Sequence, residues 1–206
     1  MIVIWAKCAI AMLCCGSLPA WAADPWCSPL GKPAFTFEWL AKGKANPSLG
    51  SVRIKDAAGK TVQVLADVEN YYRDSESFGT RTDFNNDGCA DLTVTSSVAG
   101  IGNRSSTVFL YNPRTRRFEA NEALSTIGGL ALDPKDKNCV NGDWKGGAED
   151  MYASRHCWKA GKLVLMSEYQ VSPLYGPEGE FACYEHVETK YRGGKKREKK
   201  SCTKEF

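Results

Sequence analysis

The feature that most constrains the fold is a ten-residue segment, DFNNDGCADL, at positions 83–92. Oxygen-bearing side chains occupy its positions 1, 3, 5 and 9, namely Asp83, Asn85, Asp87 and Asp91. Gly88 at position 6 can adopt the positive φ that a sharp turn requires. The segment continues directly into LTVTSS, whose β-branched residues favour a strand. The segment is therefore predicted to be a tight loop that opens into a β-strand.

This spacing of oxygens is typical of a Ca²⁺-binding loop, because Ca²⁺ takes about six to eight oxygen ligands around one point. We predict that Asp83, Asn85 and Asp87 ligate through their side chains. Cys89 would ligate through its backbone carbonyl, and Asp91 directly or through a water molecule. The alternative is a metal-free turn, since Asp, Asn and Gly are ordinary turn residues. Four correctly spaced ligands together with the glycine favour the cation.

The residues after the loop exclude the helical types of calcium site. An EF-hand needs a bidentate glutamate at position 12 and a helix that leaves the loop. Position 12 is Val94, which has no ligating side-chain atom. A dockerin would also leave in a helix and would repeat its loop, and the chain has no second copy. The loop is therefore expected between strands.

Turn signals recur along the chain about every 8–12 residues, which indicates an all-β protein built of successive antiparallel hairpins. Its arrangement is expected to be β-propeller-like or a sandwich, in a single domain over residues 23–206 with the calcium loop at 83–91. The expected strands are 34–40, 51–55, 61–65, 92–97, 107–111, 116–119, 138–144, 150–158, 162–171, 181–191 and 195–203. One short helix is expected at 121–126.

Residues 1–22 are predicted to be a cleaved signal peptide and not part of the fold. Lys7 is their single charge, an apolar run follows, and Ala20-Trp21-Ala22 has the small residues of a cleavage site. The run is too short to span a membrane. The alternative, a lipoprotein anchored at Cys14 or Cys15, fits poorly because the residues before these cysteines are not small. A periplasmic or secreted protein without a transmembrane segment is therefore expected.

Cleavage would remove three of the nine cysteines and leave an even number, which suggests disulfides in an exported chain. Hairpin geometry suggests the pairing. Cys139 and Cys157 are equidistant from a turn at 147–148, and Cys183 and Cys202 flank the Gly-Gly turn at 193–194 almost symmetrically. Cys27 and Cys89 remain, and their bond would tie the N-terminus to the calcium loop.

Charge and catalytic motifs exclude other functions. The formal charge of +3 includes Lys7, so the mature chain is nearly balanced, which argues against a nucleic-acid binder. The dense basic run at 190–200 could contact an acidic partner, or its lysines could block edge-strand pairing. The two histidines, His156 and His186, lie in expected strands, and no G-x-S-x-G is present. We expect no enzyme.

Two loops carry residues suited to contact a partner protein. The turn at 146–152 offers Glu149, Asp150 and Tyr152, and the proline-containing segment at 172–180 offers Tyr175 and Glu178. Tyrosine gives rigid amphipathic contact area at a small entropic cost, and acidic neighbours would suit a basic cleft. The alternative is that both are plain connections, with Tyr152 packed in the sheet.

Four strings together resemble exported FG-GAP/VCBS-like proteins, a group that includes periplasmic immunity proteins against lysozyme-like toxins of rival bacteria. They are SVRIKDAAGKTVQVL at 51–65, the loop at 83–92, FLYNPRTRRF at 109–118 and WKAGKLV at 158–164. The resemblance implies a β-propeller-like fold, bound Ca²⁺ and inhibition of a peptidoglycan hydrolase by a loop that plugs its cleft. Such proteins carry a glycine followed closely by a tyrosine, G-x-x-x-Y. Gly147 and Tyr152 approach that pattern with a longer spacing.

The expectation for function is an exported Ca²⁺-binding β-domain that binds and inhibits a lysozyme-like peptidoglycan hydrolase. One alternative is a cell-envelope module that binds glycan or acts in adhesion through aromatic side chains and the basic hairpin. Another is an enzyme acting on carbohydrate or peptidoglycan, for which carboxylate pairs such as Glu149 with Asp150, or Glu178 with Glu180, are the weak basis.

Overall fold

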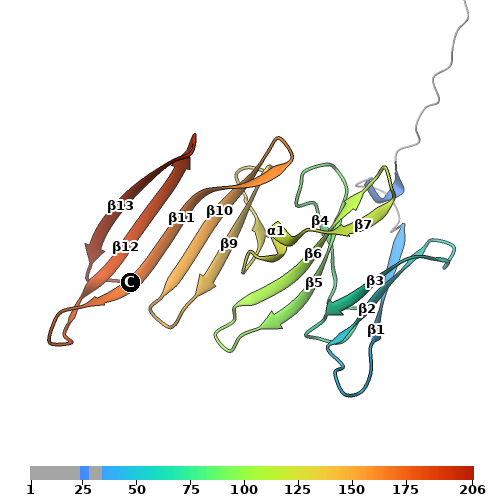
Figure 1. The fold of residues 1–206 in the computed structure, drawn as a ribbon, viewed down its shortest axis with the longest axis horizontal. Coiled ribbons are helices and arrows are strands. Elements are labelled where there is room, and N and C mark those ends of the chain that lie inside the picture. The colour runs from blue at the N-terminus through green and yellow to red at the C-terminus, as the bar shows by residue number, and fades with distance from the viewer. Residues whose placement is uncertain (1–23, 28–33) are drawn as a thin grey trace, which may run out of the picture.

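The computed structural model describes residues 24–27 and 34–206, and the signal peptide predicted for residues 1–22 lies outside this part. The fold is all-β, as the sequence predicts. Three antiparallel sheets follow one another along the long axis of the molecule (Figure 1). In each sheet the strands are neighbours in the order in which the chain makes them, so that every sheet is an open meander. The arrangement is sandwich-like and is not a closed barrel.

The N-terminal sheet has three strands and the central sheet has four. The N-terminal sheet contains β1 (Phe35–Ala41), β2 (Leu49–Asp56) and β3 (Thr61–Glu69). The central sheet contains β4 (Gly79–Thr82), β5 (Asp91–Val98), β6 (Arg104–Asn112) and β7 (Arg117–Ala120). A 3₁₀ turn, η1 (Pro25–Cys27), precedes them, and the one-turn helix α1 (Glu122–Ser125) follows them. Asn121 caps α1 by accepting the amide of Leu124.

The C-terminal sheet has six strands and is the largest. It contains β8 (Ala131–Leu132), β9 (Cys139–Lys145), β10 (Met151–Lys159), β11 (Lys162–Tyr175), β12 (Phe181–Arg192) and β13 (Lys195–Thr203). Strand β13 is its edge, and every residue of β13 is exposed. Its lysines therefore stand where charged side chains hinder pairing with another chain.

The central sheet is buried on both faces. On one face Leu92 and Val94 pack with Val52 and Ile54 of the N-terminal sheet in one apolar core. On the other face Val108 belongs to a second core. This core includes Leu124 and Val140, from α1 and β9, because successive side chains of a strand point to opposite faces. The sheets are therefore stacked in three layers with two cores.

At each junction between sheets an amide side chain bonds to both backbone groups of one residue across the junction. Gln63 of β3 donates Nε2–H to the carbonyl of Phe118 at 2.7 Å and accepts the Phe118 amide at 2.9 Å. Asn103 likewise donates to the carbonyl of Lys145 at 2.7 Å and accepts the Lys145 amide at 2.9 Å. An amide side chain can make both bonds at once because it carries a donor and an acceptor side by side.

The three predicted disulfides are present. They join Cys27 to Cys89, Cys139 to Cys157 and Cys183 to Cys202. Cys139 and Cys157 are also direct partners in the register of β9 and β10.

The end predicted for the strand at 162–171 is wrong. Strand β11 continues through Pro173 to Tyr175, where a loop was predicted from residue 172. Strand β10 begins at Met151, whose partner is Val171, so beyond that point β11 pairs with β12 alone. A proline at such a free edge loses no ladder hydrogen bond, and the strand can continue through it.

Candidate functional site

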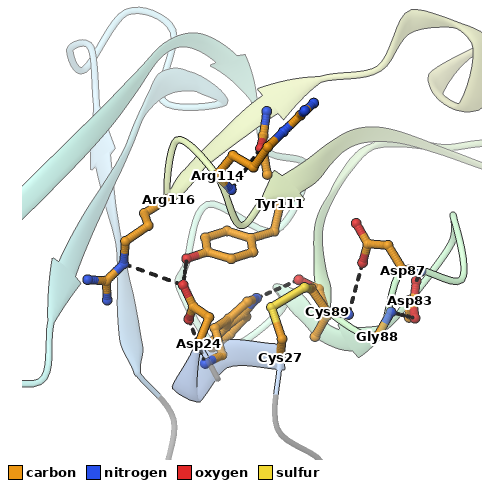
Figure 2. The surroundings of a disulfide bond; sticks show 12 residues. Asp24, Cys27, Asp83, Asp87, Gly88, Cys89, Tyr111, Arg114 and Arg116 are labelled. Atoms are coloured by element: carbon orange, nitrogen blue, oxygen red, sulfur yellow. Dashed lines mark hydrogen bonds and ion pairs between the residues drawn. A yellow bond between two sulfur atoms is a disulfide. The ribbon is translucent and has the colours of Figure 1, made fainter. Parts of the chain in front are cut away.

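The predicted calcium loop lies between β4 and β5 and folds its acidic side chains onto its own backbone. Asp83 accepts the Asp87 amide at 3.2 Å through Oδ1 and the Gly88 amide at 2.8 Å through Oδ2. Asp87 accepts the Cys89 amide at 2.9 Å (Figure 2). Gly88 has φ +87°, the left-handed conformation expected of the glycine at position 6. The sequence-predicted turn is therefore present, and it draws Asp83 and Asp87 toward the same run of amides.

Asn85 and Asp87 stand at the open side of the loop. Asn85 donates Nδ2–H to Asp87 Oδ2 at 2.9 Å. Both residues line a cleft of about 670 Å³ beside Arg114 and Trp158. A cation from solvent can therefore reach these two side chains.

Asp91 occupies a different environment from the other acids, because it is fully buried. One of its oxygens accepts the Phe84 amide at 2.7 Å, and the other accepts the Tyr111 amide at 3.0 Å. Burial raises the pKa of Asp91 to about 7, and the nearby carboxylates of Asp83 and Asp87 add to the rise against the two amide bonds. Asp91 thus joins the start of the loop to β6, and each of its oxygens keeps a second lone pair.

The donor chemistry of the loop suits a hard cation, because every proposed ligand atom is an oxygen. In the described part of the chain, the three loop carboxylates do not converge to within 4.8 Å of one another, since each is directed at backbone amides. Three other potential ligand atoms do lie within 4.8 Å of one another, and they belong to Asp136, Cys139 and Cys157. The two sulfurs form a disulfide and have no thiolate to offer a metal.

The loop is held from both sides by tryptophan side chains that the sequence did not single out. The indole N–H of Trp26 donates to the carbonyl of Ala90, and that of Trp158 donates to the carbonyl of Phe84 at 2.7 Å. The Cys27–Cys89 bond adds a covalent connection to η1. The loop is therefore fixed to its surroundings at both ends.

The segment around η1 is anchored by a cluster of aromatic side chains. The ring centroid of Trp26 lies 5.3–6.4 Å from the ring centroids of four other aromatic side chains, those of Phe35, Phe37, Tyr111 and Phe118. Asp24 accepts the Tyr111 hydroxyl at 2.8 Å and forms an ion pair with Arg116 at 3.4 Å (Figure 2). Burial, with the Asp24 hydrogen bond, raises the pKa of Tyr111 to about 12, so its hydroxyl keeps its proton and remains a donor.

Two of the predicted contact segments meet at one end of the C-terminal sheet. Tyr184 of β12 donates its hydroxyl to Glu149 at 2.7 Å. The Tyr184 ring lies 4.9 Å from that of Phe181, which in turn lies 6.2 Å from Tyr175. Phe206 continues this row at 5.2 Å from Tyr184. We call Tyr175, Phe181, Tyr184 and Phe206 the aromatic row.

The acidic residues that are predicted to contact a partner lie at different positions around this end of the C-terminal sheet. Glu178 is exposed in the turn after Tyr175, and its amide donates to Glu180. Asp150 closes the β9–β10 turn, where its carbonyl accepts the Gly146 amide at 3.1 Å. Lys204 lies 5.8 Å above the Phe181 ring, in cation–π geometry.

Tyr152 does not join the aromatic row. It pairs with Gln170, which pairs with Val187, three residues from Tyr184. An odd separation places Tyr152 and Tyr184 on opposite faces of the sheet. The Tyr152 hydroxyl donates to Glu168 at 2.6 Å. Burial and the Glu168 hydrogen bond raise the pKa of Tyr152 to about 12. Tyr152 is thus half-buried on the face opposite the aromatic row, with its hydroxyl bonded to Glu168.

The two histidines are both engaged by side chains of the C-terminal sheet. His186 lies between the Tyr169 hydroxyl and the Thr203 hydroxyl, each at 2.7 Å. His156 Nε2 lies 3.2 Å from the Ser154 hydroxyl, and burial lowers the pKa of His156.

In the described residues no helix has the length and apolar character needed to cross a membrane.

Sequence reasoning missed Phe181, Tyr184 and Phe206. Phe181 and Tyr184 lie in β12, and which of its side chains stay exposed cannot be known before the sheet order is known. Phe206 lies beyond the last strand. The pair Pro173-Leu174 before Tyr175 was the available signal for an interaction surface in this region.

Comparisons with known proteins concern the fold. No protein-family model and no curated protein matches the chain. Among solved structures, the chain is similar to one described as a Xanthomonas type IV secretion system related protein, with a TM-score of 0.51 and 17% sequence identity. The similarity covers 78% of this chain and 84% of that one. The two chains therefore share an architecture.

Proposed function

We propose that the protein is an exported, Ca²⁺-binding β-domain that binds and inhibits a lysozyme-like peptidoglycan hydrolase, as the resemblance of its sequence to FG-GAP/VCBS-like immunity proteins implies. The observation that carries the binding role is the aromatic row at the free end of the C-terminal sheet. Tyr175 is 54% exposed and Phe206 is 61% exposed, although both rings pack against other aromatic side chains.

An exposed and contiguous group of aromatic side chains supports a role in protein binding. Phe181 is 39% exposed and neighbouring Leu174 is 47% exposed, so apolar surface extends across the ends of two strands. Such patches mark interaction sites, and aromatic residues are enriched among those that contribute most to binding. The rings are already held by one another and by the Tyr184–Glu149 bond, so little side-chain entropy would be lost on binding.

The charges beside the aromatic row support a basic partner. Glu149, Glu178 and Glu205 are exposed carboxylates at this end of the sheet, where the ammonium groups of Lys145 and Lys204 also lie. Complementary charge across an interface raises the association rate and suppresses unsuitable partners. A hydrolase whose cleft is lined by basic side chains could form ion pairs with these carboxylates while it contacts the aromatic row.

Calcium has a structural role in this proposal. Asp83, Asn85 and Asp87 would hold it through their side chains and Cys89 through its carbonyl, with Asp91 completing the set. The cation would neutralise carboxylates that otherwise repel one another, and its binding would stabilise the folded state by mass action. Export is supported by the predicted signal peptide and by three disulfides, which form and persist in oxidising compartments.

The proposal is tested by measuring the lysis of purified peptidoglycan by a panel of lysozyme-like hydrolases, with and without the protein. We expect the wild type to slow at least one of them. The double variant Tyr175→Ala/Phe181→Ala should lose this effect, because it removes the centre of the aromatic row. The matched control is Tyr71→Ala/Tyr72→Ala, which removes another exposed aromatic pair, with ring centroids 5.2 Å apart, outside the C-terminal sheet. Equal inhibition by both double variants, or no inhibition by the wild type, would overturn the proposal.

A further inference from the structure

A cleft lies where the central and C-terminal sheets meet, on the face of the C-terminal sheet opposite Tyr184. Its volume is about 450 Å³, within the range of roughly 300–1,000 Å³ typical of small-molecule sites. Ser105 of β6 and residues 126–128 after α1 form one wall. The other wall comes from β9 and β10 and consists of Gly142, Trp144, Tyr152, Ser154 and His156.

The walls of the cleft are held in place by close backbone packing. The Gly128 carbonyl accepts the Asp143 amide at 3.0 Å, and the Gly129 amide donates to the Arg104 carbonyl at 2.9 Å. A Cβ on Gly128 would lie 2.5 Å from the ring of Trp144, so only glycine allows this approach. The Asn103 bridge to Lys145 fixes the same junction. The cleft is therefore preformed.

Two aromatic side chains from neighbouring strands line this cleft. Trp144 and Tyr152 are direct cross-strand partners, and Trp144 is 38% exposed. Tyr152 is held by its bond to Glu168, whose second oxygen accepts the hydroxyl of Tyr191. The rings thus form a fixed apolar platform that is open to solvent.

The polar groups of the cleft are neutral. They are the hydroxyls of Ser105, Thr126 and Ser154, the imidazole of His156 and the indole N–H of Trp144. The Tyr152 hydroxyl also belongs to the lining and already donates to Glu168. No Lys, Arg, Asp or Glu is among the residues that line it. Burial favours neutral imidazole, which carries one donor and one acceptor. The lining therefore offers hydroxyl-like hydrogen bonds and no charge.

We infer that this cleft binds a neutral sugar ring, with the ring's C–H face against Trp144 and Tyr152 and its hydroxyls toward Ser154, His156 and Thr126. Sugar C–H groups are weakly positive and are attracted to the negative face of an aromatic ring. Sugar hydroxyls donate and accept, as do the hydroxyls and imidazole of the lining. An anionic ligand would find no cation among the lining residues, and a wholly apolar ligand would leave the polar groups unpaired.

The test is a titration followed by NMR, with di-N-acetylchitobiose and cellobiose as neutral probes and glucuronic acid as the charged one. We expect a neutral probe to cause saturable shifts at the Trp144 indole and at the amides of β9 and β10. The substitution Trp144→Ala should weaken binding by about tenfold or more, because the platform loses its larger ring. Thr126→Arg, at an exposed position of the rim, should block the cleft without disturbing the core.

The control is Tyr71→Ala, an exposed aromatic outside the cleft that should bind sugar as the wild type does. The inference is contradicted if no neutral probe gives saturable shifts, if glucuronic acid binds better than both, or if Trp144→Ala and Thr126→Arg bind as well as the wild type. This site is separate from the aromatic row, so Trp144→Ala should leave hydrolase inhibition unchanged. Failure of one proposal therefore does not imply failure of the other.

Discussion

At the scale of single residues, the loop acids divide into two kinds. Asp91 is buried and joins the loop to β6, whereas Asp87 is exposed and directs one oxygen at the Cys89 amide. Removal of Asp91 would leave the buried amides of Phe84 and Tyr111 without acceptors and would destabilise the protein with or without metal. Asp87 is therefore the better residue for testing the cation.

We predict that Asp87→Ala abolishes the rise in melting temperature on addition of Ca²⁺. The variant removes one carboxylate of the proposed ligand set, and stabilisation by a ligand depends on its affinity for the folded state. The control is Asp56→Ala, since Asp56 also accepts backbone amides in a turn, at 2.9 and 3.0 Å, outside the loop. Thermal unfolding with and without Ca²⁺ should show the shift in Asp56→Ala and not in Asp87→Ala. A full shift in Asp87→Ala would refute the site.

Asp133 supplies a pH-dependent contribution to stability. The Arg155 guanidinium donates to Asp133, and the Lys135 amide donates to it at 2.8 Å, so that these groups hold the pKa of Asp133 below its usual value. A depressed pKa means that the folded protein binds this proton less readily than the unfolded chain. The resulting stabilisation is complete above the unfolded pKa and is lost as the pH falls through the folded pKa.

We predict that Asp133→Asn lowers stability near neutral pH by about 2 kcal/mol, the scale of a hydrogen bond to a charged group, which is about 6 °C in melting temperature. The difference from the wild type should shrink as the pH is lowered below about 4. Asp67→Asn is the control, because Asp67 pairs with Lys42 at the surface, with side chains 74% and 63% exposed. A constant difference across the acid range would show that Asp133 does not titrate as described.

At the scale of elements, the stacking of the sheets depends on a few cross-sheet bonds. Gln63 is 8% exposed and pairs with both backbone groups of Phe118. An apolar replacement leaves a buried donor and a buried acceptor unpaired, which costs more than a hydrogen bond contributes. Gln63 therefore matters more to stability than a polar residue in a β-strand ordinarily does.

We predict that Gln63→Leu lowers the free energy of unfolding by about 2 kcal/mol, or about 6 °C in melting temperature. Gln170→Leu is the matched control, because Gln170 is exposed and bonds only to the Ser172 hydroxyl. Chemical denaturation of both variants gives the comparison. Similar stabilities of the two would contradict a bridging role for Gln63.

The disulfides differ in the length of chain that they close and in the parts of the fold that they connect. The Cys27–Cys89 bond spans 62 residues and ends in the calcium loop, while Cys183–Cys202 spans 19 and closes the last hairpin. On the chain-entropy model, removing them costs about 4 and about 3 kcal/mol respectively. We predict that Cys27→Ser/Cys89→Ser also weakens Ca²⁺ binding, measured calorimetrically. Cys183→Ser/Cys202→Ser should leave Ca²⁺ affinity unchanged, and equal affinities in both pairs would contradict the coupling.

At the scale of the whole molecule, local patterns predict the hairpins and the disulfides but not the order of layers. The signals at 56–60 and 193–194 specify turns by themselves, and the turn at 193–194 brings Cys183 within disulfide distance of Cys202. The face to which a strand turns depends on distant partners. Tyr152 and Glu149 are close in sequence, yet one lies in a cleft and the other bonds to Tyr184 on the opposite face. Trp26 likewise bonds to Ala90, which is 64 residues away in the sequence, and no local pattern specifies this contact.

The most direct test of the proposed function is amide hydrogen exchange of the protein alone and with an inhibited hydrolase. We expect added protection around Tyr175, Phe181, Tyr184 and Phe206 and in the 146–150 turn, because the partner would cover the aromatic row. We also expect unchanged exchange in the calcium loop at 83–91, whose role is structural. Protection confined to the calcium loop or to the N-terminal sheet would contradict the account.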